Sequence, residues 1–256
     1  MKILKLSVLT LLLAIFGCSS EDDNSDVENG INRTANLKPT GSSGNDFLSA
    51  AKYNAIVMEV LYVEGFHPNA QTLINLKNFM EVRLNKPGGI TIVEREIASP
   101  GISPYDINEV ASIETLNRTK YNNGNILTLS LLFLDGKSSS DTSNSFTLGT
   151  AYRNTSFVIF ENSVQSLSDS VTEPDRTSLE TVVILHEFCH LLGLVNLGTP
   201  MVNEHLDEAH DKHCDNPDCL MYWETENSTV VQSMLAGNIP TLDAHCIQDL
   251  QANGGK

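Results

Sequence analysis

Basic residues are scarce in this chain of 256 residues. It has 16 Lys and Arg against 32 Asp and Glu, so its formal net charge is −16 at pH 7. A protein that binds nucleic acid neutralises phosphates with a basic surface, and the sequence offers no such patch. The composition therefore argues against nucleic acid as a partner and is typical of a solvated acidic surface.

Long apolar runs are absent after residue 16. Residues 6–16 are apolar and follow the basic start MKILK, which is typical of a signal peptide and too short for a permanent membrane span. The run ends in the letters IFGC, which resemble a bacterial lipobox. We therefore expect a signal peptide at residues 1–17 and lipidation of Cys18. The expected location is extracytoplasmic, lipid-anchored in the outer membrane or at the cell surface.

Large apolar residues are also few between residues 19 and 45, where Ser, Asp, Glu, Asn and Gly dominate. Such a segment cannot bury enough surface to order itself, so residues 18–45 are expected to form a flexible acidic tether. Its opening letters, SSEDD, resemble the export signal of Bacteroidetes-type surface lipoproteins. Residues 46–256 are expected to form one domain, and a monomer is expected.

The apolar patterns of the remaining chain alternate between strand and helix. Strands are expected at residues 55–63, 89–97, 126–134, 146–152 and 156–160, and helical segments at residues 69–84, 104–121, 176–194 and 242–251. This order predicts an α/β (α+β) layered fold. The chain after Gly193 is expected to be irregular and to end in the short helix.

The motif H-E-x-x-H-x-x-G lies in the predicted helix 176–194. Residues four apart share a helix face, so His186 and His190 present two imidazoles to one point. A catalytic zinc takes three protein ligands and keeps a position for water. Glu187 is close enough to that water to act as its general base. The motif therefore predicts a metal-assisted hydrolase.

The strands followed by this helix, with Gly193 three residues beyond His190, resemble the metzincin clan of zinc metallopeptidases. The resemblance implies a zincin/metzincin-like mixed sheet with a motif helix and an irregular C-terminal subdomain. In the clan a third zinc-binding His comes three residues after the Gly. Here that position is Asn196, and a neutral amide is a poor zinc ligand.

A second block, H-C-D-N-P-D-C-L-M, begins at His213. It is similar to the archaemetzincin segment in which a zinc-binding His directly precedes C-x4-C-x-M. The resemblance implies that His213 is the third ligand, that Met221 forms the Met-turn and that residues 197–212 are an insertion. The C-terminal C-x-x-C of archaemetzincins is not matched, because only Cys246 is present there, so their structural zinc site is not expected.

The choice of third ligand remains open at this point. His205 and His210 are the main alternatives to His213, and Asn196 and Glu208 are less favoured candidates. A glutamate some twenty residues beyond the motif would resemble thermolysin-like enzymes, which lack the Gly and the Met-turn.

Cysteines are few, and none lies between Cys18 and Cys189. This excludes a cysteine switch, in which a thiolate from a propeptide blocks the zinc. The other three are Cys214, Cys219 and Cys246. In an oxidising compartment they suggest disulfides, with Cys214–Cys219 and Cys189–Cys246 as the natural pairs. Free buried thiols or a second metal site are the alternatives.

Two functions are compatible with these features. The first is a zinc-dependent endopeptidase with one catalytic Zn²⁺, in which Glu187 takes the proton of the attacking water and a peptide or protein substrate lies along the strand at 146–152. The second is a catalytically silent metzincin-fold binding or scaffold lipoprotein, suggested by Asn196 at the usual ligand position.

Overall fold

The computed structural model describes residues 27–28, 31–235 and 239–256. The predicted signal peptide at residues 1–17 and the lipidation site Cys18 lie outside these residues. No helix within the described ranges is long and apolar enough to cross a membrane.

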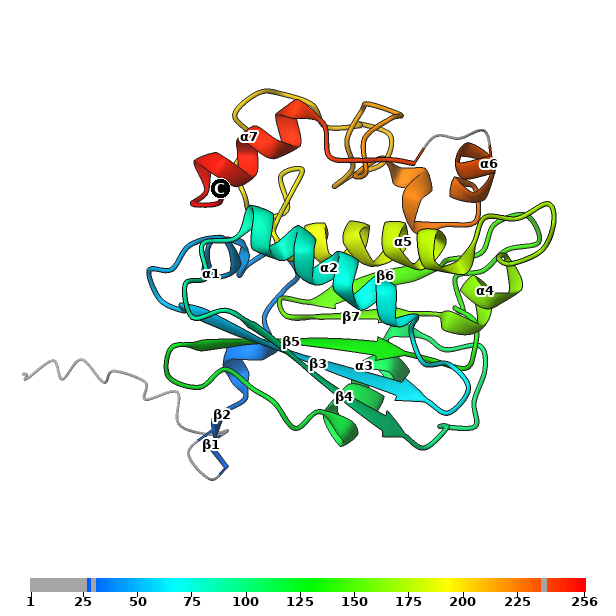
Figure 1. Cartoon of the computed structure of the whole chain (residues 1–256), viewed down its shortest axis with the longest axis horizontal. Helices are drawn as coiled ribbons and strands as arrows, with labels where there is room; N and C mark the ends of the chain where they lie inside the picture. Colours follow the sequence, from blue (N-terminus) through cyan, green and yellow to red (C-terminus); the bar gives the residue numbers. More distant parts are fainter. Residues whose placement is uncertain (1–26, 29–30, 236–238) are drawn as a thin grey trace, which may run out of the picture.

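A mixed five-stranded sheet forms the centre of the protein (Figure 1). Its order is β4-β3-β5-β7-β6, with β3 Ala55–Val63, β4 Ile90–Ile97, β5 Ile126–Phe133, β6 Gly149–Arg153 and β7 Ser156–Ile159. The first four strands in this order run parallel, and β6 pairs antiparallel with β7 at one edge. The α/β (α+β) prediction is thereby confirmed, with a mixed sheet.

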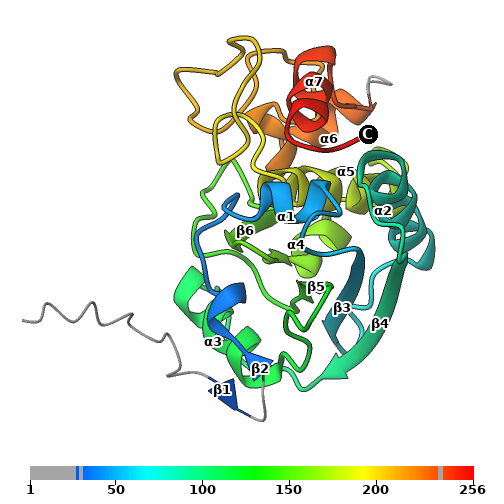
Figure 2. The same ribbon diagram turned by 90° about the vertical axis from the view of Figure 1, so that its left-hand side faces the viewer.

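Both faces of the sheet are covered, as expected for parallel strands rich in Val, Ile and Leu. Alternate residues point to opposite faces, so Leu131 of β5 joins the core under two helices whereas Leu132 joins the core on the other side. The two helices are α2 (Ala70–Arg83) and α5 (Arg176–Leu191), and α3 (Ile107–Asn117) covers the opposite face (Figures 1 and 2).

The C-terminal part lies beyond α5, on the side away from the sheet (Figure 1). It is mostly irregular and contains the 3-10 helix η2 (Trp223–Glu226), α6 (Val230–Leu235) and α7 (Ala244–Ala252). The long elements follow their predicted ranges within a few residues. The short elements α1 (Gly44–Leu48), α4 (Glu161–Ser166), α6, η1 (Thr34–Asn36) and the pair β1 (Val27–Glu28) and β2 (Ile31–Asn32) were not predicted, because each is too short to show a period.

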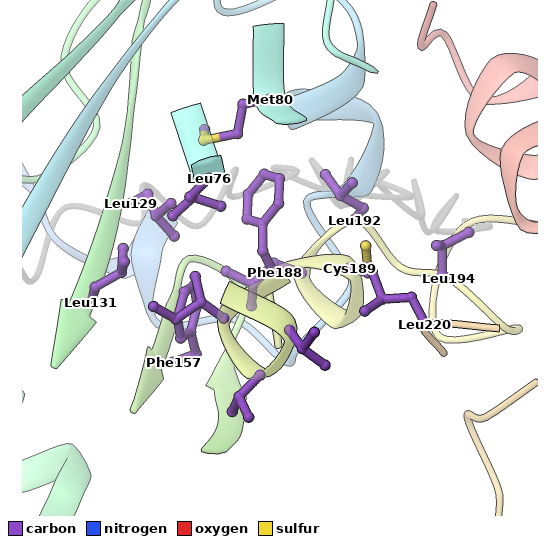
Figure 3. Close-up of a cluster of buried hydrophobic side chains, with 14 of the residues drawn as sticks. Leu76, Met80, Leu129, Leu131, Phe157, Phe188, Cys189, Leu192, Leu194 and Leu220 are labelled. Carbon is purple, nitrogen blue, oxygen red and sulfur yellow. The ribbon is translucent and has the colours of Figure 1, made fainter. Parts of the chain in front are cut away.

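Aromatic packing fixes α5 against the rest of the core. Phe188 points from α5 toward Leu76 and Met80 of α2 (Figure 3). Its ring meets Phe47 edge-on at 5.5 Å between centroids and Phe79 at 6.4 Å. Such pairs stabilise a core by roughly 0.5–1.5 kcal/mol beyond the area they bury. These contacts anchor the motif helix to α1 and α2.

The tether predicted at residues 18–45 includes residues that belong to the folded domain. Residues 33–45 pack on the domain, where the buried Asn36 donates hydrogen bonds to Asn122 Oδ1 and Thr155 Oγ1, each at 2.9 Å. Lys38 pairs with Asn154, whose N–H donates to the Lys38 carbonyl at 2.9 Å. The boundary at residue 45 was wrong because polar side chains, which look like a linker in the sequence, anchor this segment by hydrogen bonds rather than by apolar burial.

Candidate metal centre

Helix α5 brings the two motif histidines together. Its start is fixed by Asp175, whose side chain accepts from the Ser178 N–H at 3.0 Å. His186 and His190 are buried one turn apart, with their Nε2 atoms 3.0 Å from each other. The chain leaves the helix at Gly193, where φ is +78° and a Cβ would lie 2.7 Å from the Thr199 nitrogen.

His213 completes a group of three imidazoles. Its ring stacks on His186 at 5.3 Å between centroids and meets His190 edge-on at 5.1 Å. The buried His213 Nε2 has no hydrogen-bond partner among the described residues. Together with a carboxylate oxygen of Glu226, one nitrogen from each ring lies within 4.8 Å of the others. The three histidines are those that the sequence predicted to lie together, whereas Glu226 was not predicted.

Hydrogen bonds orient two of these rings. His186 Nδ1 lies 2.7 Å from the Leu220 carbonyl and His213 Nδ1 lies 3.1 Å from the Asp211 carbonyl. A carbonyl only accepts, so each Nδ1 carries a proton, and in the neutral imidazole this leaves the lone pair on Nε2. This arrangement is usual for metal-ligating histidines. Met221 follows Leu220 directly and is fully buried, and its carbonyl accepts from the Cys214 N–H at 2.8 Å.

Burial keeps the motif histidines neutral. It lowers the pKa of His186 to about 4, with the neighbouring His213 contributing in the same direction and Glu226 opposing it. Burial, followed by His186 and His213, lowers the pKa of His190 well below its usual value. Both rings are therefore neutral at pH 7, the form in which imidazole binds zinc. The donor set fits a zinc ion.

Glu187 is fully buried beside this group. Burial, with the charge of Glu226 adding to it, raises the pKa of its carboxyl well above the usual value. A Cβ on Gly149 of β6 would lie 2.7 Å from Glu187 Cγ, so only glycine leaves room for this side chain. Glu187 also lines a cavity of about 280 Å³ that it shares with His190, His213, Glu226, Thr40, Thr150, Ala151, Leu197, Asp211 and Lys212. The cavity leaves space for a small chemical group beside Glu187, His190 and His213.

The other candidates for third ligand lie elsewhere. His210 stacks on Trp223 at 4.2 Å and pairs with Asp207 at 2.7 Å. Asn196 is exposed and has a φ of 61°. His205 is buried 2.8 Å from Asp249 and belongs to a second group.

That second group consists of His205, Cys214, Asp243 and Cys246, whose ligand atoms lie within 4.8 Å of one another. Cys219 borders it, with its Sγ 3.7 Å from Cys246 Sγ. Hydrogen bonds with the Cys214 and Cys246 thiols lower the pKa of Cys219 to about 4. The same contacts among the thiols raise the pKa of Cys214 to about 11 and raise that of Cys246 as well. Because cysteine and histidine are zinc ligands, this group could also hold a metal ion.

The predicted disulfides Cys214–Cys219 and Cys189–Cys246 are not formed, because all four cysteines are free in the structure. The Cys219–Cys246 separation of 3.7 Å also exceeds the roughly 2.05 Å of a disulfide bond. Three of the thiols converge with an imidazole instead of pairing. Cys189 points into the apolar core, where burial raises its pKa (Figure 3).

Two carboxylates of these groups escaped the sequence analysis. Asp243 stands three residues before Cys246, which is the C-x-x-C spacing with Asp in first place, so a search that allowed carboxylates could have found it. Glu226 lies five residues after Met221 in a segment without periodicity. No signal in the sequence ties it to the motif helix.

The strand predicted to bind substrate, β6, lies at the edge of the sheet, but neighbouring segments form hydrogen bonds just before it and within it. Before β6, the Leu148 N–H donates to the Glu226 carbonyl at 2.9 Å, and Thr147 bridges to Asn227. Within β6, Thr40 Oγ1 donates to the Ala151 carbonyl at 3.4 Å. Gly149 and Thr150 lie between these contacts, at the cavity.

No protein family matches the chain by sequence, and no curated protein sequence matches it. In structure it is similar to archaemetzincin from Methanopyrus kandleri, with 16% sequence identity, 78% of this chain and 96% of that chain covered, and a TM-score of 0.49. At this identity and TM-score the likeness shows neither family nor activity.

Proposed function

We propose that this protein is a zinc-dependent hydrolase of peptide bonds. The observation that carries the proposal is the convergence of three buried imidazoles with the carboxyl of Glu187 beside them at a cavity. His186, His190 and His213 would hold the ion, and the ion would supply Lewis-acid activation of water and of the scissile carbonyl.

The chain's own groups account for the remaining chemistry. Glu187 accepts a proton from the attacking water and returns it to the leaving amine, a role that fits its buried carboxyl oxygens at the cavity, which are unpaired within the described part of the chain. The Leu220 carbonyl holds the His186 ring in the tautomer that presents Nε2. The backbone of Gly149 and Thr150 is placed to pair with a short stretch of extended substrate.

The proposal is tested by metal removal and return. We expect the purified full-length protein to contain zinc and to cleave a casein-type substrate, to lose cleavage after chelation and to regain it when zinc is added. A protein that keeps stoichiometric zinc but cleaves nothing would instead support the alternative scaffold function.

We further propose that the second group binds a structural zinc through His205, Cys214, Cys219 and Cys246, with Asp249 orienting His205 and Asp243 capping α7. Four nitrogen and sulfur ligands make a closed tetrahedral site. Because the C-x-x-C of archaemetzincins is absent, the sequence did not predict this site; His205, from the segment 197–212, would supply the ligand that the missing cysteine cannot.

This second ion has a direct test. We expect metal analysis to find two zinc ions per chain in the wild type and one in Cys246→Ala, with a lower Tm for the variant because metal binding stabilises the folded state. Finding one ion in both proteins would exclude the structural site. Cys189→Ala is the matched control, since that thiol lies outside the group.

We also propose, from the sequence alone, that Cys18 is lipidated and that the protein works outside the cytoplasm, as a monomer. Mass analysis of the mature N-terminus would test the first point.

A further inference from the structure

We propose that Glu226 is a fourth protein ligand of the metal held by His186, His190 and His213, so that the described conformation is a closed form of the site. The inference rests on the proposed function. It assigns a role to a carboxylate that the hydrolytic chemistry does not use.

The geometry of Glu226 matches that of a ligand. Its Oε2 atom lies 3.9 Å from His186 Nε2 and 3.7 Å from His213 Nε2, and the two motif Nε2 atoms are 3.0 Å apart. Two ligands at about 2.0–2.1 Å from a tetrahedral zinc are about 3.4 Å from each other. Three imidazoles and one carboxylate thus complete a tetrahedral set. In a catalytic site the fourth position belongs to water.

The backbone holds Glu226 in this place. Its carbonyl accepts from Leu148 N–H at 2.9 Å, and the Ser228 N–H donates to the Phe146 carbonyl at 2.8 Å. The Phe146 N–H donates in turn to Ser228 Oγ at 3.0 Å. These bonds form a short antiparallel pairing between residues 226–228 and the stretch that leads into β6. The same segment therefore supplies the fourth ligand and occupies backbone positions next to the substrate strand.

Opening the site requires two contacts to break together: that of Glu226 with the metal, and the backbone pairing of residues 226–228 with residues 146–148. If residues 226–228 leave residues 146–148, Glu226 leaves the metal, water gains the fourth position and the edge of the sheet becomes longer. Substrate and Glu226 compete for the same place, so removing the carboxylate increases turnover rather than abolishing it. If Glu226 instead had a catalytic or substrate-binding role, removing its carboxylate would lower turnover.

The test compares Glu226→Gln with wild type, both full-length and loaded with zinc. A neutral amide is a poor zinc ligand, so acetohydroxamate, which needs an open position on the metal, is expected to bind the variant at least about tenfold more tightly by calorimetry. Cleavage of a casein-type substrate is expected to rise in the same variant. Glu224→Gln is the matched control, since Glu224 lies on the same 3-10 helix but lines a different cavity.

Equal hydroxamate affinity in Glu226→Gln and wild type would overturn the inference, as would loss of cleavage in a variant that keeps its zinc. If cleavage depends on zinc but does not respond to Glu226→Gln, only this inference fails. A protein that binds no zinc at the three histidines overturns the proposed function as well.

Discussion

Glu187→Gln is expected to lower the rate of peptide cleavage by roughly 10²–10⁴-fold, the contribution of a positioned general base. Glutamine has nearly the same shape as glutamate, so it should fit the space that Gly149 leaves and should not disturb the neighbouring histidines. The bound zinc and the Tm are expected to stay at their wild-type values. The loss would then belong to proton transfer and not to the metal or the fold.

The measurement is kcat on a peptide substrate alongside metal analysis of the same samples. Glu187→Asp is the companion variant, because it keeps the charge and withdraws it by one methylene, and an intermediate rate is expected. Full activity in Glu187→Gln would contradict the assignment of Glu187 as base and would require another proton acceptor at the cavity.

Glu114→Ala is expected to destabilise the protein by about 3–5 kcal/mol, the usual cost of leaving a buried charge without its partner. Glu114 is fully buried and lies 2.7 Å from Arg118 Nη1 and 2.8 Å from Arg153 Nη1. Ser156 donates to the same carboxylate at 2.5 Å. The variant leaves the buried Arg118 guanidinium uncompensated and frees Arg153 at the end of β6.

Urea unfolding of the wild type and of Glu114→Ala measures this loss in the free energy of unfolding. Glu81→Ala is the matched control, because Lys77 and Glu81 also form a pair four residues apart on a helix, at 3.9 Å, but on the surface. Its expected cost is below about 1 kcal/mol. Equal costs for the buried and the exposed pair would contradict the account given of Glu114.

Periodicity explains how much of this arrangement could be read from the sequence. The long elements follow from their apolar patterns, and the helix that carries His186 and His190 is the clearest of them, because both its spacing and its cap are local. His213 was reached only by resemblance to a known segment. Nothing within residues 197–213 tells which of His205, His210 and His213 joins His186 and His190.

Non-local contacts explain the rest. Glu226 reaches the histidines because residues 226–228 pair with residues 146–148, a contact made across some eighty positions of chain. His205 joins the thiols through its bond to Asp249 on the last helix. The segment before residue 45 looked unstructured because its attachment is polar. Such contacts leave no period and no composition bias in a single sequence.

The two groups proposed to bind zinc are joined along the chain at two points. His213 adjoins Cys214, and Cys219 adjoins Leu220, whose carbonyl fixes the His186 ring. When Cys214 and Cys219 are held in place, His213 and the Leu220 carbonyl therefore also lose conformational freedom. Occupation of either group should raise the affinity of its neighbour, and by thermodynamic linkage the coupling is the same in both directions. If both ions bind as proposed, a zinc titration of the metal-free protein would be cooperative, and loss of the ion at the thiols would weaken binding at His186, His190 and His213 without touching these ligands.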